Sequence, residues 1–456
     1  MQPMTKLTTA LVLSGISASI AFGQTSLTPE VLFADNFESN NLAAWPFSTV
    51  SGTATALTPV TVSASTTEHV FEGQYAVKVQ GRSGAPTGDP LRSPRVSKGA
   101  LFSRQQTADE TVVFSHFIYD QVGGAGVTTS GTDSIYNQRF FVALRESGGV
   151  DPFVGLNQII AHGLWNGANT SFGTGFVGNA WFGLAPTGQN IANHYAGRIF
   201  SVAPGAGFMS GTTTLELGGN SAPNWMFYGV GDDYRRSNGW HKFTTVYNVR
   251  RVEFYVDSML YGAWDINPNL TGTQRKLNTI ILNPTLETAS QDVWVDDIKV
   301  RAFPNGSMQI LPILGDIVNQ TAAQSVAFSL ELVPINGNTN SAVSTFTANM
   351  NANGEINIGF PVDVRGDYNL VIDGGSWLKR VVPITLTETG VFEHKVNMQN
   401  GDPDSSGEVD AADIDLVIAN FGQMAVGPNN GDVDLSDEVD AADIDIVIAN
   451  FGGVDD

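Results

Sequence analysis

Carboxylate side chains recur at matching positions in two segments near the end of the chain. The first segment reads GDPDSSGEVDAADIDLVIANFG from Gly401, and the second reads GDVDLSDEVDAADIDIVIANFG from Gly431. A fixed spacing between similar segments indicates one structural unit that is used twice. Calcium is a hard cation that binds about six to eight oxygen ligands in flexible geometry. The repeated Asp, Ser and Glu residues therefore predict two calcium-binding loops.

The spacing of these residues matches that of an EF-hand loop, which takes ligands from alternate positions and from a last carboxylate further on. In the first loop the predicted ligands are Asp402, Asp404, Ser406, Glu408, Asp410 and Asp413. In the second loop they are Asp432, Asp434, Ser436, Glu438, Asp440 and Asp443. The two glutamates are expected to bind through their backbone carbonyls. Gly407 stands at the sharp turn of the first loop, but Asp437 takes that place in the second, where we expect looser binding.

Each loop runs directly into a short predicted helix. Asp410 is a good N-cap residue and Asp413 follows at the spacing of a capping box, and the second copy repeats them as Asp440 and Asp443. Apolar side chains then recur at helical spacing, namely Ile414, Val417, Ile418 and Phe421, and in the second copy Ile444, Val447, Ile448 and Phe451. Gly422 is predicted to end the first helix in a left-handed conformation. An acidic solvating tail would show neither the repeat nor the apolar period.

The pattern D-x-D-x-S-G-x-V-D-x-x-D, followed by one helix and used twice, resembles a type I dockerin. The resemblance covers residues 400–456. It implies two calcium ions bound by the residues named above, and a cohesin-like or other surface protein as the docking partner. A unit this small has little core, and carboxylates crowd each loop, so we expect its folding to depend on calcium.

Composition and charge limit what the whole chain does. The chain has 456 residues, no cysteine and a net charge of −22, and residues 400–456 carry fifteen Asp and Glu and no Lys or Arg. Disulfides and thiol chemistry are excluded, and a nucleic-acid partner is not expected because phosphate binding needs clustered basic residues. Residues 1–23 read as a signal peptide, with Lys6 before the apolar stretch Leu7–Phe22 and a cut before Gln24. We therefore expect a protein that is secreted or on the cell surface, with no membrane span.

Residues 24–303 are predicted to form one large β-sandwich, because many short alternating segments are separated by Gly, Asn, Pro and Ser clusters. The segments FADNFES, GWHKFTTVYNVRRVEFYVDSMLYGAW and VWVDDIKV resemble concanavalin-like or laminin-G-like jelly rolls and carbohydrate-binding modules. In such modules the first and last strands lie together and share a structural calcium, which implies the ligands Asp35, Glu38 and Asp297. The resemblance also implies sugar binding, with candidate aromatic residues Trp225, Tyr228, Trp240 and Trp264.

Residues 304–399 are predicted to form a second, smaller β-sandwich. The segments SVAFSLEL, STFTANM, EINIGF and DYNLVID alternate with period two, and NANGE reads as a hairpin turn. The stretch from Asn353 to Arg380 resembles transthyretin-like or carboxypeptidase-regulatory-like domains, which act as spacers. The predicted fold class is therefore mainly β, with a large jelly roll, a small β-sandwich and a small paired EF-hand-like helical unit.

Three functions remain open on the sequence. The first is a non-catalytic protein that binds a glycan or surface component and attaches through its C-terminal unit, in a polysaccharide-utilisation context. The second is a glycoside hydrolase or polysaccharide lyase with its site in the jelly roll, to which Glu146, Asp232, Asp233, Glu253 and Asp265 are candidate contributors. The third is a structural cell-surface protein. No GxSxG elbow and no zinc-ligand spacing occur, so no catalytic residue is assigned, and we favour the first function.

Overall fold

A computed structural model describes most of the chain. The described residues are 26–51, 60–64, 69–79, 95–120, 140–147, 151–153, 158–164, 195–201, 225–227, 237–265, 276–282, 292–335, 344–360, 364–387, 390–424 and 426–456. The predicted signal peptide lies outside them. The protein is mainly β, as expected, and in the part that the structure describes no helix is long and apolar enough to cross a membrane.

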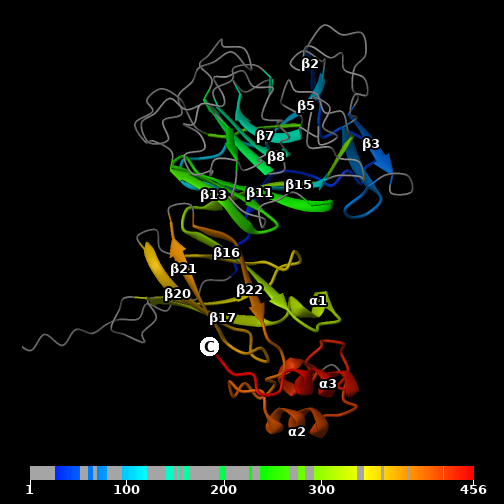
Figure 1. The fold of residues 1–456 in the computed structure, drawn as a ribbon, viewed down its shortest axis with the longest axis vertical. Helices are drawn as coiled ribbons and strands as arrows, with labels where there is room; N and C mark the ends of the chain where they lie inside the picture. The colour runs from blue at the N-terminus through cyan, green and yellow to red at the C-terminus, as the bar shows by residue number, and fades with distance from the viewer. Residues whose placement is uncertain are drawn as a thin grey trace, which may run out of the picture.

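Two facing sheets build the large domain (Figure 1). The first runs β13 (Met259–Asp265), β12 (Arg251–Val256), β11 (Gly239–Tyr247), β6 (Glu110–Asp120), β15 (Val293–Pro304), β4 (Tyr75–Val79) and β3 (Val60–Ala64), with β1 (Glu30–Asp35) also on β15. The second runs β10 (Trp225–Phe227), β9 (Tyr195–Ser201), β8 (Gln158–Leu164), β7 (Phe140–Glu146), β14 (Thr279–Leu282), β5 (Arg95–Leu101) and β2 (Phe47–Ser51). Alternate residues such as Phe114, Leu144, Phe243 and Ile280 fill the core between them. The first and last strands pair, with Asp35 opposite Ile298, as expected.

Two smaller sheets form the middle domain. One contains β19 (Ile356–Gly359), β16 (Ser307–Leu314) and β22 (Val391–Met398), and the other contains β18 (Ser344–Asn349), β17 (Ala327–Pro334), β20 (Gly366–Asp373) and β21 (Arg380–Leu386). A short helix, α1 (Gln320–Ala323), precedes β17. The four predicted strands and the turn at Asn351 are confirmed, because Asn351 N–H donates to Glu355 O and Gly354 has φ +75°.

Residues 400–456, called the C-terminal module below, contain the two predicted helices, α2 (Ala411–Ala419) and α3 (Ala441–Ala449), joined through η3 (Pro428–Asn430). Both capping boxes are confirmed, with Asp410 and Asp440 as N-caps. The small core contains Val409, Val417 and their counterparts in the second copy, all fully buried. Each loop pairs with the segment after the other helix, since Gly452 N–H donates to Val409 O and Gly422 N–H donates to Val439 O. The two copies therefore fold as one unit.

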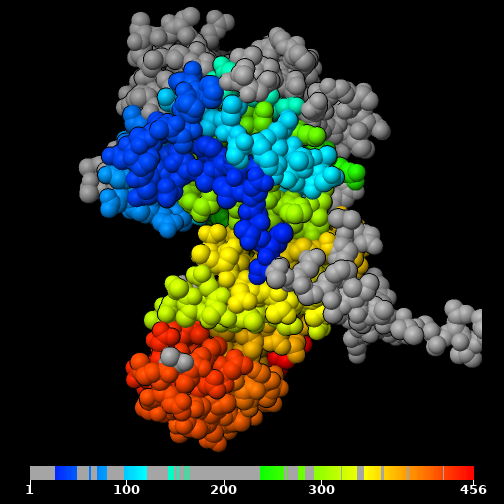
Figure 2. Space-filling model, turned by 180° about the vertical axis from the view of Figure 1, so that it is seen from behind, coloured from blue at the N-terminus to red at the C-terminus, as the bar shows by residue number. Residues whose placement is uncertain are grey.

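The three parts are joined by buried contacts and follow one another along the long axis of the molecule (Figures 1 and 2). The carboxylate of Glu393 in β22 is buried, and it accepts hydrogen bonds from Lys242 Nζ at 2.8 Å and from Ser258 Oγ at 2.7 Å in the large domain. At the other end of the middle domain, Leu435 of the second loop packs in the middle-domain core, and Leu378 packs in the core of the C-terminal module. The module is therefore anchored to the middle domain.

Candidate metal centre

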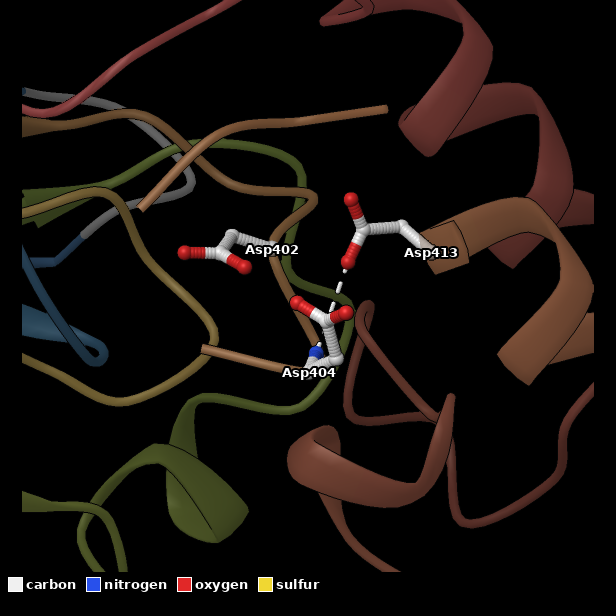
Figure 3. A group of neighbouring side chains, drawn as sticks. All are labelled: Asp402, Asp404 and Asp413. Carbon is white, nitrogen blue, oxygen red and sulfur yellow. Dashed lines mark hydrogen bonds between the residues drawn. The ribbon is translucent and has the colours of Figure 1, made fainter. Parts of the chain in front are cut away.

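Three carboxylates gather in each loop of the C-terminal module. Asp402, Asp404 and Asp413 each offer an oxygen, and these oxygens lie within 4.8 Å of one another at the start of α2 (Figure 3). Asp432, Asp434 and Asp443 form the matching group at the start of α3. Among the described residues, only these two sets of Asp, Glu, His or Cys lie this close together. The structure thus brings together half of the predicted ligands in each loop.

Backbone hydrogen bonds fold each loop around its first carboxylate. In the first loop, Ser406 N–H donates to Asp402 Oδ1 and Gly407 N–H donates to Asp402 Oδ2, both at 2.9 Å. Gly407 has φ +87°, a left-handed conformation that glycine adopts at little cost. Asp437 adopts the same conformation, with φ +73°, at the equivalent place in the second loop. The second loop therefore keeps the turn, at the cost of a strained non-glycine residue.

The remaining predicted ligands lie beside the carboxylate groups. Ser406 Oγ donates to the backbone oxygen of Glu408 at 3.1 Å, and Ser436 Oγ donates to that of Glu438 at 3.0 Å. The predicted hydroxyl and carbonyl ligands are thus neighbours in each loop. The Asp410 side chain instead accepts from Ala412 N–H at 2.7 Å, and Asp440 does the same with Ala442. Asp410 and Asp440 are engaged as helix caps, which suits a ligand position that often binds through water.

The carboxylates destabilise one another in the absence of a cation. Burial, together with the nearby carboxyls of Asp404 and Asp413, raises the pKa of Asp402 to about 6. Burial and the carboxylates of Asp443 and Asp434 likewise raise the pKa of Asp432 to about 6. The basic side chains at this end, Lys379 and Arg380, pair with the last residues of the chain, Asp455 and Asp456. A bound cation would remove this penalty.

The chemistry of the donor set fits calcium. Every oxygen in the two groups comes from a carboxylate, with a hydroxyl and a backbone carbonyl beside them, and these are ligands that hard cations prefer. Zinc favours histidine and thiolate ligands, and the chain has no cysteine. A calcium ion in the first loop would be held by Asp402, Asp404 and Asp413, with Ser406 and the Glu408 carbonyl able to complete its shell.

Among the described residues, the three proposed ligands of a calcium site in the large domain do not form a close group of oxygens like those of the C-terminal module. Asp35 accepts hydrogen bonds from Trp45 Nε1 and Phe37 N–H, and Glu38 accepts from the backbone of residues 74 and 75. Asp297 pairs with Lys299 at 3.0 Å. Each carboxylate therefore has partners of its own, although the pairing of the strands that carry Asp35 and Asp297 is as expected. A metal at this place remains a prediction.

Of the four aromatic residues predicted to bind sugar, the structure describes the side chain of Trp240 alone. Trp225 lies in β10 and Trp264 in β13, but their side chains, like all of Tyr228, are outside the described residues. The Trp240 ring contacts Tyr119 and Phe71 edge-on, with centroids 5.4 and 5.9 Å away. Phe71 stacks on Phe117 and is 40% exposed. The sequence did not point to Phe71, because its strand neighbours are known only once β6 and β11 are paired.

The carboxylates considered for a glycosidase are placed in part. Glu146 ends β7, where burial raises its pKa to about 7. Glu253 accepts from Arg251 Nε and from Tyr255 Oη, both at 2.7 Å, which is a structural network. Asp232 and Asp233 lie outside the described residues, as does the side chain of Asp265. No paired arrangement of two carboxylates follows from the described residues.

Large apolar side chains are exposed in both helices of the C-terminal module and in the segments that follow them. Ile418 and Phe421 of the first copy are each 55% exposed, and Met424 is 64% exposed. The second copy exposes Ile448, Phe451 and Val454 to a similar extent. The helical spacing found in the sequence therefore serves the core only through Ile414, Val417 and their counterparts. We call the six exposed residues the apolar face of the module.

Comparisons with known proteins give structural neighbours alone. No protein-family model matches the sequence, and no curated protein matches it. A chain of a type II cohesin–X-dockerin complex from Acetivibrio cellulolyticus is 18% identical, with a TM-score of 0.24, over 32% of this chain and 96% of that one. The catalytic domain of a laminarinase from Thermotoga petrophila is 10% identical, with a TM-score of 0.31, over 60% of this chain and 98% of that one.

A third neighbour comes from work on endo-acting O-glycanases of the human gut microbiota. It is 11% identical, with a TM-score of 0.31, over 60% of this chain and 99% of that one. The neighbours thus include a cohesin–dockerin complex and carbohydrate-active β-sandwich domains. TM-scores this low carry no argument about the chemistry of the site, which is derived from the residues of this chain.

Proposed function

We propose that this is an exported attachment protein. Its C-terminal module binds two calcium ions and docks onto a cohesin-like partner in the manner of a dockerin, and its large β domain contacts a polysaccharide. The middle domain holds the two ends apart. The observation that carries the proposal is the pair of matching three-carboxylate groups, each at the start of a capped helix.

Calcium gives the module its shape. Without a cation, six carboxylates are held close together in two small groups, and burial disfavours the charged forms of Asp402 and Asp432. With calcium, each loop gains ligand bonds that tie its turn to the first residues of the following helix. Because the core of the module is small, we expect metal binding and local folding to be coupled.

The apolar face supplies the docking surface. Six large apolar side chains are more than half exposed, and they come in matching positions from the two copies. Large apolar side chains exposed in number on a small module are typical of protein–protein contacts. The module lies at the far end of the molecule from the large domain, so a partner can reach it freely (Figures 1 and 2). We assign this face to a cohesin-like protein because the loop–helix repeat resembles a dockerin.

Aromatic rings on the large domain support the polysaccharide contact. Across the eight-stranded sheet, Trp240 of β11 lies opposite Tyr119 of β6, which lies opposite Trp294 of β15. Phe71 adds an exposed ring beside Trp240. Sugar rings bind to exposed aromatic rings, so exposed Phe71 and the partly exposed Trp240 and Tyr119 form a candidate platform, with buried Trp294 supporting it from β15. It keeps Trp240 from the sequence prediction and adds Tyr119 and Phe71.

Calcium-dependent binding of the full mature chain to a panel of purified cohesins tests the docking. We expect at least one cohesin to bind in calcium, to be released by EDTA, and to bind about 10-fold or more weakly to a Phe421→Ser/Phe451→Ser variant. An exposed-site control, Val31→Ser in β1 of the large domain, should bind normally, since Val31 is 53% exposed and lies outside the C-terminal module. Binding that is unaffected by EDTA and by the substitutions of Phe421 and Phe451 would contradict the proposal.

A polysaccharide array with a reducing-sugar assay tests the proposed polysaccharide contact of the large domain. We expect retention on at least one polysaccharide, weakened by Trp240→Ala, with no release of sugar. Release of reducing sugar would instead support the hydrolase alternative, and neither retention nor release would support a structural surface protein.

A further inference from the structure

Three polar residues at one edge of the large domain form a Ser–His–Asp chain. Nδ1 of His241, in β11, lies 2.7 Å from Oδ2 of Asp257, which stands in the turn between β12 and β13. Nε2 of the same ring lies 3.1 Å from Oγ of Ser237, just before β11. A base that contacts a hydroxyl on one side and a carboxylate on the other is the arrangement that activates a serine nucleophile.

The carboxylate of Asp257 is held in place by the fold. Asp257 and Ser258 have φ of +50° and +66°, which is the pattern of a tight hairpin turn with both central residues left-handed. Lys242 N–H donates to Asp257 Oδ1 at 2.9 Å, and Lys395 Nζ donates to Asp257 O at 2.8 Å. One carboxylate oxygen is thus fixed by the backbone, and the other is aimed at His241.

His241 is set up to hold and pass a proton. Burial alone would lower its pKa, but hydrogen bonds and charge from Asp257, with Ser237 O and Asp120 adding to them, raise the pKa of His241. Nε2 also lies 2.9 Å from the carbonyl oxygen of Ser237, to which the protonated ring donates. In the neutral ring, Asp257 keeps the proton on Nδ1, so the Nε2 lone pair is directed at the Ser237 hydroxyl instead.

We propose that Ser237, His241 and Asp257 form an ester-cleaving site, with Ser237 as the nucleophile. In the first step Ser237 Oγ bonds to the carbonyl carbon of an ester, and its proton passes to His241 Nε2. The bond from that carbon to the alcohol oxygen breaks, and the alcohol leaves with the proton from His241. Water then attacks the acyl-serine, again through His241, which releases the carboxylic acid and restores the Ser237 hydroxyl.

Exposure indicates the kind of ester. Ser237 and Asn238 are exposed, and Gly239 has open space where a side chain would stand. A hydroxyl at the surface reaches small acyl groups, such as acetyl esters, that are carried on a large molecule. The site is separate from the C-terminal module, so this proposal stands or falls independently of calcium binding and docking.

A fluorophosphonate probe tests the nucleophile, because it forms a covalent adduct with activated serines. We expect an adduct on Ser237 of the full mature chain, mapped by peptide mass spectrometry. The adduct should be absent in Ser237→Ala, and its rate of formation should fall about 100-fold or more in His241→Asn. Hydrolysis of p-nitrophenyl acetate should fall in parallel.

Ser325→Ala is the matched control. Ser325 is an exposed serine whose hydroxyl donates to Ala322 O, so its loss should leave both labelling and hydrolysis unchanged. Asp257→Asn should slow labelling by at least about 10-fold, because the amide no longer holds the proton on Nδ1. No adduct on Ser237, an adduct that persists at full rate in His241→Asn, or equal hydrolysis by wild type and Ser237→Ala would each overturn the proposal.

Discussion

The two loops of the C-terminal module have nearly the same sequence but lie in different surroundings. In the first loop Asp404 is exposed, and the residue after it, Ser405, donates to Gly375 O at the surface. In the second loop all three clustered carboxylates are buried. The residue that corresponds to Ser405 is Leu435, which is 3% exposed and packs in the middle-domain core.

Backbone contacts reinforce this difference. Val318 N–H of the middle domain donates to Asp434 O at 2.7 Å, and Asn400 Nδ2 donates to Val433 O at 2.7 Å. The first loop touches the middle domain through Asp402 N–H, which donates to Ser376 O, and it also contacts the end of the chain, since Asp455 N–H donates to Gly407 O. Both loops are hydrogen-bonded to the middle domain, but only the second loop also buries a side chain, Leu435, in its core. We expect the second loop to link calcium to the middle domain, and the first loop to act more independently.

The largest expected effect comes from Leu435. Leu435→Ala leaves a cavity in the middle-domain core, which costs roughly 2–5 kcal/mol. Ser405→Ala, at the equivalent place, should stay within about 0.5 kcal/mol of wild type. Hydrogen exchange measured by mass spectrometry should show faster exchange in both the middle domain and the C-terminal module for Leu435→Ala. Equal exchange in the two variants would show that the loops are equivalent.

Removing one carboxylate from each loop should weaken one calcium site at a time. Asp404→Asn and Asp434→Asn each delete a ligand charge, and we expect affinity at the altered loop to fall about 10-fold or more, or about 1.4 kcal/mol. Only Asp434→Asn should also loosen the middle domain, as measured by hydrogen exchange without added salt. If Asp404→Asn loosens the middle domain equally, the proposed link through the second loop is wrong.

Substitutions of the two turn residues, Asp437 and Gly407, should change the stability of the module in opposite directions. Asp437→Gly relieves a left-handed aspartate and should stabilise the module by about 1 kcal/mol. Gly407→Ala places a side chain at φ +87° and against the Asp455 carboxylate, and should destabilise it by about 1–2 kcal/mol. Thermal unfolding of the calcium-loaded chain, followed by helical circular dichroism, compares the two. A stabilising Gly407→Ala change would contradict the geometry of the turn.

The smallest difference between the loops is expected in their response to pH. Burial and neighbouring carboxylates raise the pKa of both Asp402 and Asp432 to about 6, above the value in an unfolded chain. A raised carboxyl pKa destabilises the folded form at pH above about 6, and the penalty disappears as the pH falls through 6 toward 4. The calcium-free module should therefore be more stable at pH 5 than at pH 7.5. A calcium-free module that melts lower at pH 5 would contradict this sign.

Local features of the module followed from the sequence, but its contacts did not. The ligand spacing, the caps at Asp410 and Asp440 and the buried Val409 depend on neighbours within a few residues, so a single segment carries the information. The burial of Leu435 depends on core residues of the middle domain that are far from it in the sequence, and nothing in the repeat shows what covers this side chain. The exposure of Ile418 and Phe421 was missed for the same reason, because helical spacing does not show what covers a helix.

In the large domain, too, the sequence predicts local elements but not the contacts between them. Alternation predicted its strands, but the pairing of β6 with β11 decides which rings meet at Trp240, and the pairing of β11 with β12 places His241 beside Asp257. Ser237 and His241 are four residues apart, and Asp257 follows sixteen residues later across a hairpin. A search for a GxSxG elbow could not find this arrangement, because it arises from a strand and a turn.

Titration calorimetry of the chelator-stripped full chain with calcium tests the central claim most directly. The account predicts two ions bound per chain, one of them bound about 10-fold or more weakly after Asp404→Asn or Asp434→Asn, and none after the Asp402→Ala/Asp432→Ala double change. No heat of binding with the wild-type chain, or binding that survives the double change, would contradict it.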